Sequence, residues 1–286
     1  MTSSIADRRL SPVRPDLAAA HLLGQVKAAR FVTGERRGVT APIASLRRSS
    51  TPDGANETEA LYGEAAVIFE EKDGWAWGQL ERDSYVGYIE TEALGAPVAA
   101  THRVSVPRSF GFPGASIKLR PTLALPFDAR VAIASHTGDF AVTADGLHFW
   151  ARHLTPLGQW ESDFVAVAER FIGAPYLWGG RTPLGVDCSG LVQTALAAAG
   201  LKAPRDSDQQ EAALGAPVAF DASLDGLRRG DLVFWKGHVG IMRDAQTLLH
   251  ASGWHMLTVS EPLREARERI IETAREPITS VRRLEF

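Results

Sequence analysis

The residues best suited to chemistry lie in two short segments, one around the single cysteine and one around a pair of histidines. Cys188 follows Asp187, and Gly179 and Gly180 lie a few residues upstream. Because glycine has no Cβ, the backbone can approach closely there and adopt positive φ. An aspartate in this position is typical of a helix cap, which predicts Cys188 at a helix N-terminus. Unpaired N–H groups and the helix dipole favour a thiolate there, so we expect a lowered pKa and a nearby oxyanion site.

A lone cysteine is more often a small buried apolar residue than a nucleophile. The helix start and the glycine-rich approach favour the reactive interpretation of Cys188.

His238 begins a predicted strand after a tight turn, and His250 lies on the next predicted strand. Neighbouring antiparallel strands can bring two such rings together. We expect His238 to be the base for Cys188 and His250 to orient it. The alternative is a satisfied core or surface histidine, which is our interpretation of the other six of the eight histidines. The spacing is not that of a metal site, so no metal or other cofactor is expected.

The elements that position these residues follow an α+β pattern from residue 156 to residue 286. Two helices come first and strands follow, which favours an antiparallel sheet. The predicted helices and strands are Asp163–Ile172, Cys188–Ala199, Asp231–Trp235, Val239–Met242, Thr247–Ala251, Pro262–Ala274 and Ser280–Leu284.

Three further segments are predicted upstream. Residues 1–45 form an arm with a short amphipathic helix around Leu17–Ala29. Short strands separated by turns then predict two small β-barrels, one over residues 46–100 and one over residues 101–155. One of the strands predicted in the second barrel is Ser116–Leu119.

The composition is that of an ordinary globular protein, with 286 residues of which 45% are hydrophobic. A net charge of -3 argues against a nucleic-acid partner. No apolar run approaches the roughly 18 residues of a membrane span. The N-terminus does not resemble a secretory signal, so we expect a cytoplasmic protein, while the oligomeric state stays open.

The Asp-Cys-Ser-Gly run at Cys188, the Gly-His-Val-Gly-Ile run at His238 and the further histidine at His250 resemble the NlpC/P60 cysteine peptidases. The resemblance covers about Asp163 to Leu284. It implies a papain-like core with Cys188, His238 and His250 as the catalytic triad.

Two SH3-like barrels before such a domain are similar to the γ-D-glutamyl-L-diamino acid endopeptidases. This resemblance implies an α+β chain in which two small SH3-like barrels precede the papain-like domain. It also implies hydrolysis of the γ-D-Glu-diamino acid bond in small murein peptides with a free N-terminal L-Ala, as in the recycling of cell-wall peptides.

The same resemblance places Asp206 and Ser207 in the substrate site, where Asp206 would pair with the ammonium group and Ser207 and Ser189 would bond peptide or carboxylate groups. Asp206 alternatively caps the following helix. Tyr176 is expected to assist the oxyanion site, and Trp178 is either a pocket wall or a core residue.

In the resembled family the first barrel closes the site with an acid and a tyrosine. The phrase Leu-Tyr-Gly-Glu carries the acid to Glu64, and the tyrosine is carried to Tyr85, with Tyr62 as a weaker candidate. The alternative is that Glu64 and Tyr85 are ordinary barrel residues.

Three other functions stay open from the sequence. The first is an endopeptidase on intact peptidoglycan, and the second is a non-catalytic module that binds wall peptides. The third is an acyltransferase or amidase on the same fold.

Overall fold

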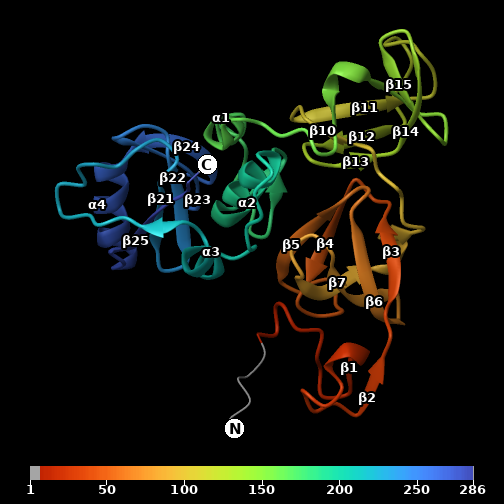
Figure 1. Cartoon of the computed structure of the whole chain (residues 1–286), viewed down its shortest axis with the longest axis horizontal. Coiled ribbons are helices and arrows are strands. Elements are labelled where there is room, and N and C mark those ends of the chain that lie inside the picture. The colour runs from red at the N-terminus through yellow and green to blue at the C-terminus, as the bar shows by residue number, and fades with distance from the viewer. Residues whose placement is uncertain (1–6, 286) are drawn as a thin grey trace. The chain divides into compact units, whose positions relative to one another are not determined.

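The computed structural model describes residues 7–285, and the chain divides into two compact units, Met1–Leu157 and Gly158–Phe286 (Figure 1). Within the described residues, no helix is both long and apolar enough to cross a membrane.

The first unit begins with a short parallel pair, β1 (Leu17–Ala19) and β2 (Arg30–Val32), joined through a 3₁₀ turn. The helix predicted over Leu17–Ala29 is therefore wrong. All three residues of β1 are completely buried, and Leu17 packs with Trp77 and Val86. Three consecutive buried side chains suit a strand covered on both faces, whereas a surface helix would bury only one stripe.

A seven-stranded antiparallel sheet follows, in the order β5-β4-β8-β7-β6-β3-β9. The sheet begins at Glu35, which lies upstream of residue 46, the first residue of the predicted barrel. Its core contains small and aliphatic side chains together with Tyr85. The strands are β3 (Glu35–Val39), β4 (Ile43–Arg47), β5 (Asn56–Leu61), β6 (Ala65–Lys72), β7 (Trp75–Leu80), β8 (Val86–Glu90) and β9 (Leu94–Gly95).

The rest of the first unit holds a three-stranded sheet, β13-β10-β17, and a five-stranded sheet, β12-β11-β16-β15-β14. Leu125 and Phe149 are completely buried in the shared core. The strand predicted over Ser116–Leu119 is wrong: that segment is a turn, and Ile117 is 72% exposed. The strands are β10 (His102–Val104), β11 (Arg108–Phe112), β12 (Leu123–Pro126), β13 (Arg130–Val131), β14 (Ile133–Thr137), β15 (Phe140–Thr143), β16 (His148–Trp150) and β17 (Leu154–Pro156).

The second unit has the predicted α+β order. Its six-stranded sheet runs β20-β25-β21-β22-β23-β24, with α2 on one side and α4 on the other (Figure 1). The helices are α1 (Phe164–Glu169), α2 (Cys188–Ala198), α3 (Ser207–Ala213) and α4 (Leu263–Ala274). The strands are a small pair, β18 (Arg181–Thr182) and β19 (Gly185–Val186), and those of the sheet, β20 (Ala216–Pro217), β21 (Leu232–Trp235), β22 (His238–Met242), β23 (Thr247–Ser252), β24 (Leu257–Pro262) and β25 (Ile278–Arg283).

Two capping aspartates explain why the first two helices begin where they do. Asp163 accepts hydrogen bonds from Val165 and Ala166, and Asp187 accepts one from Gly190. Almost every residue of α2 is buried, and the helix packs against β22 and β23. The predictions of helices around 163–172 and 188–199 are thus confirmed, and the capping side chains fix the first turn of each.

Candidate active site

Cys188 is the first residue of α2, as predicted from the sequence. Burial, and after it the neighbouring Asp187 carboxylate, raise the pKa of its thiol to about 12. Backbone hydrogen bonds from Val239 and Ser189 act in the opposite direction. The expectation of a lowered pKa is therefore wrong, because the loss of hydration outweighs the helix start. These shifts favour the neutral thiol over the thiolate in the resting protein.

The two histidines of the predicted triad lie on adjacent strands. His238 is the first residue of β22, and His250 lies within β23. A hydrogen bond of 2.8 Å connects Nε2 of His238 and Nδ1 of His250. Gly240 lies between them; a Cβ there would be 3.2 Å from the Cβ of His250 and 2.6 Å from the Leu248 side chain. A side chain at this position would therefore clash with Leu248 and crowd the Cβ of His250.

The hydrogen bond from Val239 places the sulfur of Cys188 at the start of β22, beside His238 in the chain. Burial lowers the pKa of His238, and His250 and Arg269 lower it further. The imidazole is thus neutral at rest. A neutral thiol and a neutral imidazole can react by transferring the proton as the sulfur attacks.

Asp187 and Arg205 form a buried ion pair that the sequence reasoning missed. Oδ2 of Asp187 lies 2.6 Å from Nη2 of Arg205 and accepts from the backbone N–H of Gly179 at 2.8 Å. Oδ1 accepts from Gly190 at 2.7 Å and from Nη1 of Arg205 at 2.9 Å. One carboxylate therefore fixes the glycine loop, the start of α2 and the segment before α3. A Cβ on Gly190 would lie 2.2 Å from the carbonyl oxygen of Gly180.

Ser189 is buried within this cluster. Its hydroxyl accepts a hydrogen bond from Arg205 at 2.8 Å and donates to Asp187 at 3.3 Å. Its carbonyl accepts from Gln210 at 2.9 Å. These contacts give Ser189 a supporting role, and they argue against the predicted contact with substrate.

Asp206 and Ser207 begin α3 directly after Arg205. Asp206 occupies the N-cap position, but its side chain makes no capping hydrogen bond, so the capping alternative does not explain it. Both residues are half-buried. Their predicted contact with substrate stays a prediction.

Tyr176 and Trp178 lie in the loop that precedes the cysteine. Burial raises the pKa of the Tyr176 hydroxyl, and Cys188 and Asp187 raise it further, which requires the phenol to be near both. Trp178 is 66% exposed, so the core interpretation is wrong.

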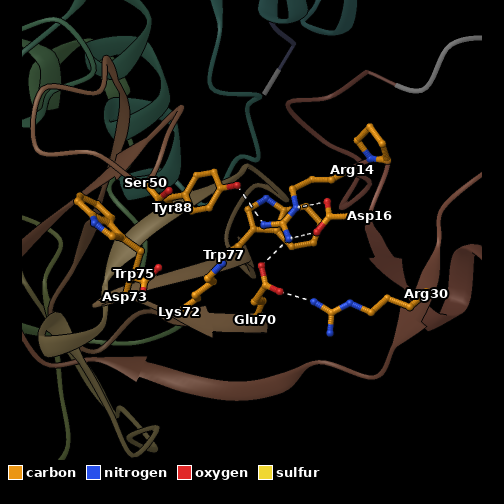
Figure 2. A pocket seen from close by; sticks show the side chains of 11 residues that line it. Arg14, Asp16, Arg30, Ser50, Glu70, Lys72, Asp73, Trp75, Trp77 and Tyr88 are labelled. Atoms are coloured by element: carbon orange, nitrogen blue, oxygen red, sulfur yellow. Dashed lines mark hydrogen bonds and ion pairs between the residues drawn. The ribbon is translucent and has the colours of Figure 1, made fainter.

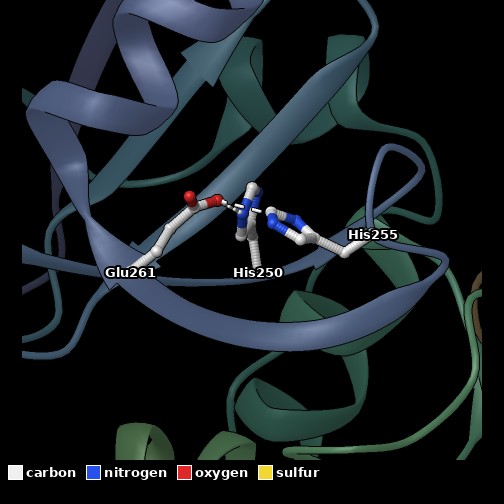
Figure 3. A group of neighbouring side chains, drawn as sticks. All are labelled: His250, His255 and Glu261. Atoms are coloured by element: carbon white, nitrogen blue, oxygen red, sulfur yellow. Dashed lines mark hydrogen bonds and ion pairs between the residues drawn. The ribbon is translucent and has the colours of Figure 1, made fainter.

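Behind His250 stands a group that the sequence reasoning also missed (Figure 3). Nε2 of His250 lies 2.7 Å from Oε1 of Glu261, and Arg269 binds both oxygens of Glu261, at 2.5 and 2.7 Å. Ligand atoms of His250, His255 and Glu261 lie within 4.8 Å of one another, a spacing that could hold a metal ion. Only the register of β24 and the position of α4 bring these residues together.

In the first unit, Glu64 is buried where the two sets of strands meet. It accepts from the backbone N–H of Leu61 at 2.9 Å and from Arg82 at 2.9 Å. Arg82 also binds Asp128, at 2.5 Å. This burial favours the structural alternative for Glu64. Tyr62 packs on the core of the second set of strands.

Tyr85 is also buried, and its hydroxyl donates to Oε2 of Glu57 at 3.0 Å. Glu57 in turn pairs with Arg48. The acid beside this tyrosine is therefore Glu57, which is not the residue carried over from the family phrase. The predicted substrate contact of Tyr85 stays a prediction.

The first unit also has a pocket of about 600 Å³ between the N-terminal segment and the seven-stranded sheet (Figure 2). Trp75, Trp77 and Tyr88 line it. The guanidinium of Arg14 lies over Trp77, 4.4 Å from the ring centre, and is paired with Glu70. Arg14 thus links the N-terminal segment to the aromatic side chains of the sheet.

Comparisons with known proteins agree with this architecture. Residues 173–273 match the NlpC/P60 family, and residues 46–94 match the bacterial dipeptidyl-peptidase SH3 domain. The gamma-D-glutamyl-L-lysine dipeptidyl-peptidase of Bacillus subtilis (strain 168) is 29% identical over 74% of this chain and 79% of its own length. Dipeptidyl-peptidase 6 of Lysinibacillus sphaericus is 35% identical, but the match spans only 36% of each chain.

Among solved structures, an NlpC/P60 family protein from Bacillus cereus ATCC 10987 aligns with a TM-score of 0.71. The alignment covers 87% of this chain and 99% of the other, at 20% identity, and shows a shared fold. Residues 173–273 thus form a peptidase domain of the NlpC/P60 type, and a bacterial dipeptidyl-peptidase SH3 domain precedes it over residues 46–94.

Proposed function

We propose that the protein is a cysteine peptidase that hydrolyses the γ-D-Glu-diamino acid bond of murein peptides with a free N-terminal L-Ala. Two contacts carry this proposal. The rings of His238 and His250 are hydrogen-bonded at 2.8 Å, and the backbone N–H of Val239, the residue after His238, donates to the sulfur of Cys188. The similarity to the dipeptidyl-peptidase of Bacillus subtilis supports the choice of substrate.

The chemistry begins from the neutral pair. His238 accepts the thiol proton as the sulfur of Cys188 attacks the γ-carbonyl carbon of D-Glu. Backbone N–H groups at the start of α2 donate to the developing oxyanion, assisted by the nearby Tyr176 hydroxyl. The imidazolium then protonates the leaving amine, and the acyl group remains on sulfur as a thioester. His238 next activates a water molecule, which releases L-Ala-γ-D-Glu and restores the thiol.

Asp206 is the proposed partner of the substrate ammonium group. It occupies the N-cap position of α3 directly after Arg205, whose guanidinium is held by the buried Asp187 carboxylate at 2.6 Å. Ser207 follows it at the first position of α3 and is the proposed partner of a peptide or carboxylate group of the same substrate. A charge-assisted bond to a free amine would distinguish free from blocked peptides.

We further propose that the protein recycles small peptides released from the wall and that it does so in the cytoplasm. The free L-Ala amine that we propose as a requirement would fit this role, because that amine is amide-linked in intact peptidoglycan. Such a requirement would separate the recycling function from an endopeptidase on intact wall.

The test is to incubate the purified full chain with L-Ala-γ-D-Glu-diaminopimelate and with its N-acetylated form, and to identify the products by mass spectrometry. We expect L-Ala-γ-D-Glu and free diaminopimelate from the first peptide only. Equal cleavage of both peptides would instead favour the endopeptidase. Binding without cleavage would favour the non-catalytic module, and transfer to an added amine would favour an acyltransferase.

A further inference from the structure

Glu261 is placed to determine where the protons of the paired histidines lie. It sits on β24, and register pairs His250 with Val259, so His250 and Glu261 share one face of the sheet. Although burial opposes it, hydrogen bonds from His250 and Arg269 lower the pKa of Glu261 to about 2. Glu261 is therefore an ionised carboxylate and can only accept hydrogen bonds.

The ionised carboxylate determines which ring nitrogen carries the proton in His250 and then in His238. Because Oε1 of Glu261 accepts, Nε2 of His250 must carry the proton. Burial keeps His250 neutral, so its Nδ1 is bare and accepts from Nε2 of His238. A neutral His238 with its proton on Nε2 has a bare Nδ1, which is the form a base requires.

We propose that Glu261, held by Arg269, is a positioning residue that fixes the tautomers of both His250 and His238 and thereby keeps His238 able to accept the thiol proton. This inference rests on the proposed roles of Cys188 and His238. It adds a carboxylate and a guanidinium behind the third member of the triad.

Arg269 makes the geometry specific. It comes from α4, which packs against β23 and β24, and it binds Oε1 at 2.5 Å and Oε2 at 2.7 Å. A guanidinium that meets both oxygens leaves the carboxylate one orientation, with Oε1 toward His250. Figure 3 shows Glu261 pointing at the His250 ring from the neighbouring strand.

The same atoms have a spacing that could suit a metal ion, with Nδ1 of His255 3.9 Å from Oε1 of Glu261. Arg269 argues for the positioning role instead, because a divalent cation would have to share both carboxylate oxygens with a fixed positive charge. His255 also contacts the hydroxyl of Ser252 through Nδ1, at 3.1 Å.

The experiment compares three variants of the full chain: Glu261→Gln, which keeps an acceptor oxygen, Glu261→Leu, which removes it, and Arg269→Met, which keeps the carboxylate. Glu169→Gln is the matched control, because Glu169 pairs with Arg229 and Arg243 at the surface of the same unit. The measurements are kcat and KM for L-Ala-γ-D-Glu-diaminopimelate, the melting temperature, and the ring-nitrogen NMR pattern of ¹⁵N-histidine protein, assigned with His238 and His250 variants.

We expect both rings to carry their proton on Nε2 in the unaltered protein and in the control, and this preference to weaken in Arg269→Met, because the carboxylate loses the guanidinium that orients it. In Glu261→Leu this preference should be lost, with kcat reduced roughly 10- to 100-fold, KM little changed and Glu261→Gln intermediate. An unaltered protein with the His250 proton on Nδ1 would overturn the inference. So would a Glu261→Leu protein that keeps both tautomers, whatever its activity.

The NMR pattern does not require turnover, so it separates this inference from the proposed function. If the unaltered protein cleaves nothing but shows the expected tautomers, the substrate assignment fails and the positioning role stands. A final arm adds zinc chloride to the unaltered protein. Stoichiometric binding that shifts the His250 and His255 signals at micromolar zinc would replace the positioning role by a metal site.

Discussion

At the scale of single residues, the chemistry depends on a nucleophile and a base that are both neutral at rest. Burial holds the pKa of the Cys188 thiol high and the pKa of His238 low. From this neutral state, proton transfer to His238 accompanies attack by the sulfur. Activity then depends on His238 being unprotonated when substrate arrives.

This dependence has a definite sign with pH. A lowered pKa keeps His238 unprotonated at pH values where an ordinary histidine is already charged. The value of kcat/KM should therefore stay constant as the pH falls past about 6.5, the ordinary pKa of histidine. It should decline only at lower pH, where His238 takes up a proton before substrate binds. Initial rates measured from about pH 4 to about pH 8, with circular dichroism to confirm folding, check this. An acid limb centred at or above the ordinary histidine value would contradict it.

A second residue-scale prediction concerns recognition of the substrate amine. Asp206→Asn should lower kcat/KM for the free-amine peptide by about 1.5–3 kcal/mol of transition-state stabilisation, because a charge-assisted bond is lost. The rate for the N-acetylated peptide should change little.

Asp208→Asn is the matched control, since Asp208 is an exposed residue on the same helix. Equal losses for both peptides in Asp206→Asn would show that Asp206 acts on the fold and not on the amine.

At the scale of elements, the buried pair of Asp187 and Arg205 joins the start of α2 to the start of α3. Arg205→Met leaves the Asp187 carboxylate buried without its partner, which should cost about 3–5 kcal/mol of unfolding free energy. Denaturant unfolding measures this cost.

The control is Arg229→Met, which breaks a pair with Asp163 that is 39% and 44% exposed. That change should cost no more than about 1 kcal/mol. A loss in Arg205→Met as small as in the control would contradict the assignment of Arg205 as the residue that fixes these elements.

The elements also show how far local sequence determines structure. The helix start at Cys188 and the strand start at His238 could be predicted, because a capping aspartate and a glycine turn are local signals. Glu261 and Arg269 could not, because their proximity to His250 depends on the register of β23 against β24. The pKa of Cys188 was misjudged for a related reason, since burial is the sum of contacts from distant segments. The helix predicted over Leu17–Ala29 is wrong because packing of Leu17 against Trp77 overrides the local amphipathic pattern.

At the scale of the whole molecule, the first unit depends on a buried cluster of Glu64, Arg82 and Asp128 that connects its two sets of strands. Glu64→Gln should lower the melting temperature of the full chain by removing one charge from this cluster, at a cost of about 3–5 kcal/mol to the unit. The preference for free over acetylated peptide should not change.

Both quantities can be measured on the same preparation, by calorimetry and by the peptide assay. Glu81→Gln is a suitable control, because Glu81 is bound to Arg36 at the surface. Loss of the free-amine preference in Glu64→Gln, with an unchanged melting temperature, would restore the role expected from the family phrase.

The central claim is that the sulfur of Cys188 forms the bond to the γ-D-glutamyl carbonyl. It is tested by acid-quenching the reaction with L-Ala-γ-D-Glu-diaminopimelate during turnover and analysing the digested protein by mass spectrometry. We predict an L-Ala-γ-D-Glu adduct on the peptide that contains Cys188, and no cleavage by Cys188→Ala. Continued cleavage by a correctly folded Cys188→Ala protein would contradict the account.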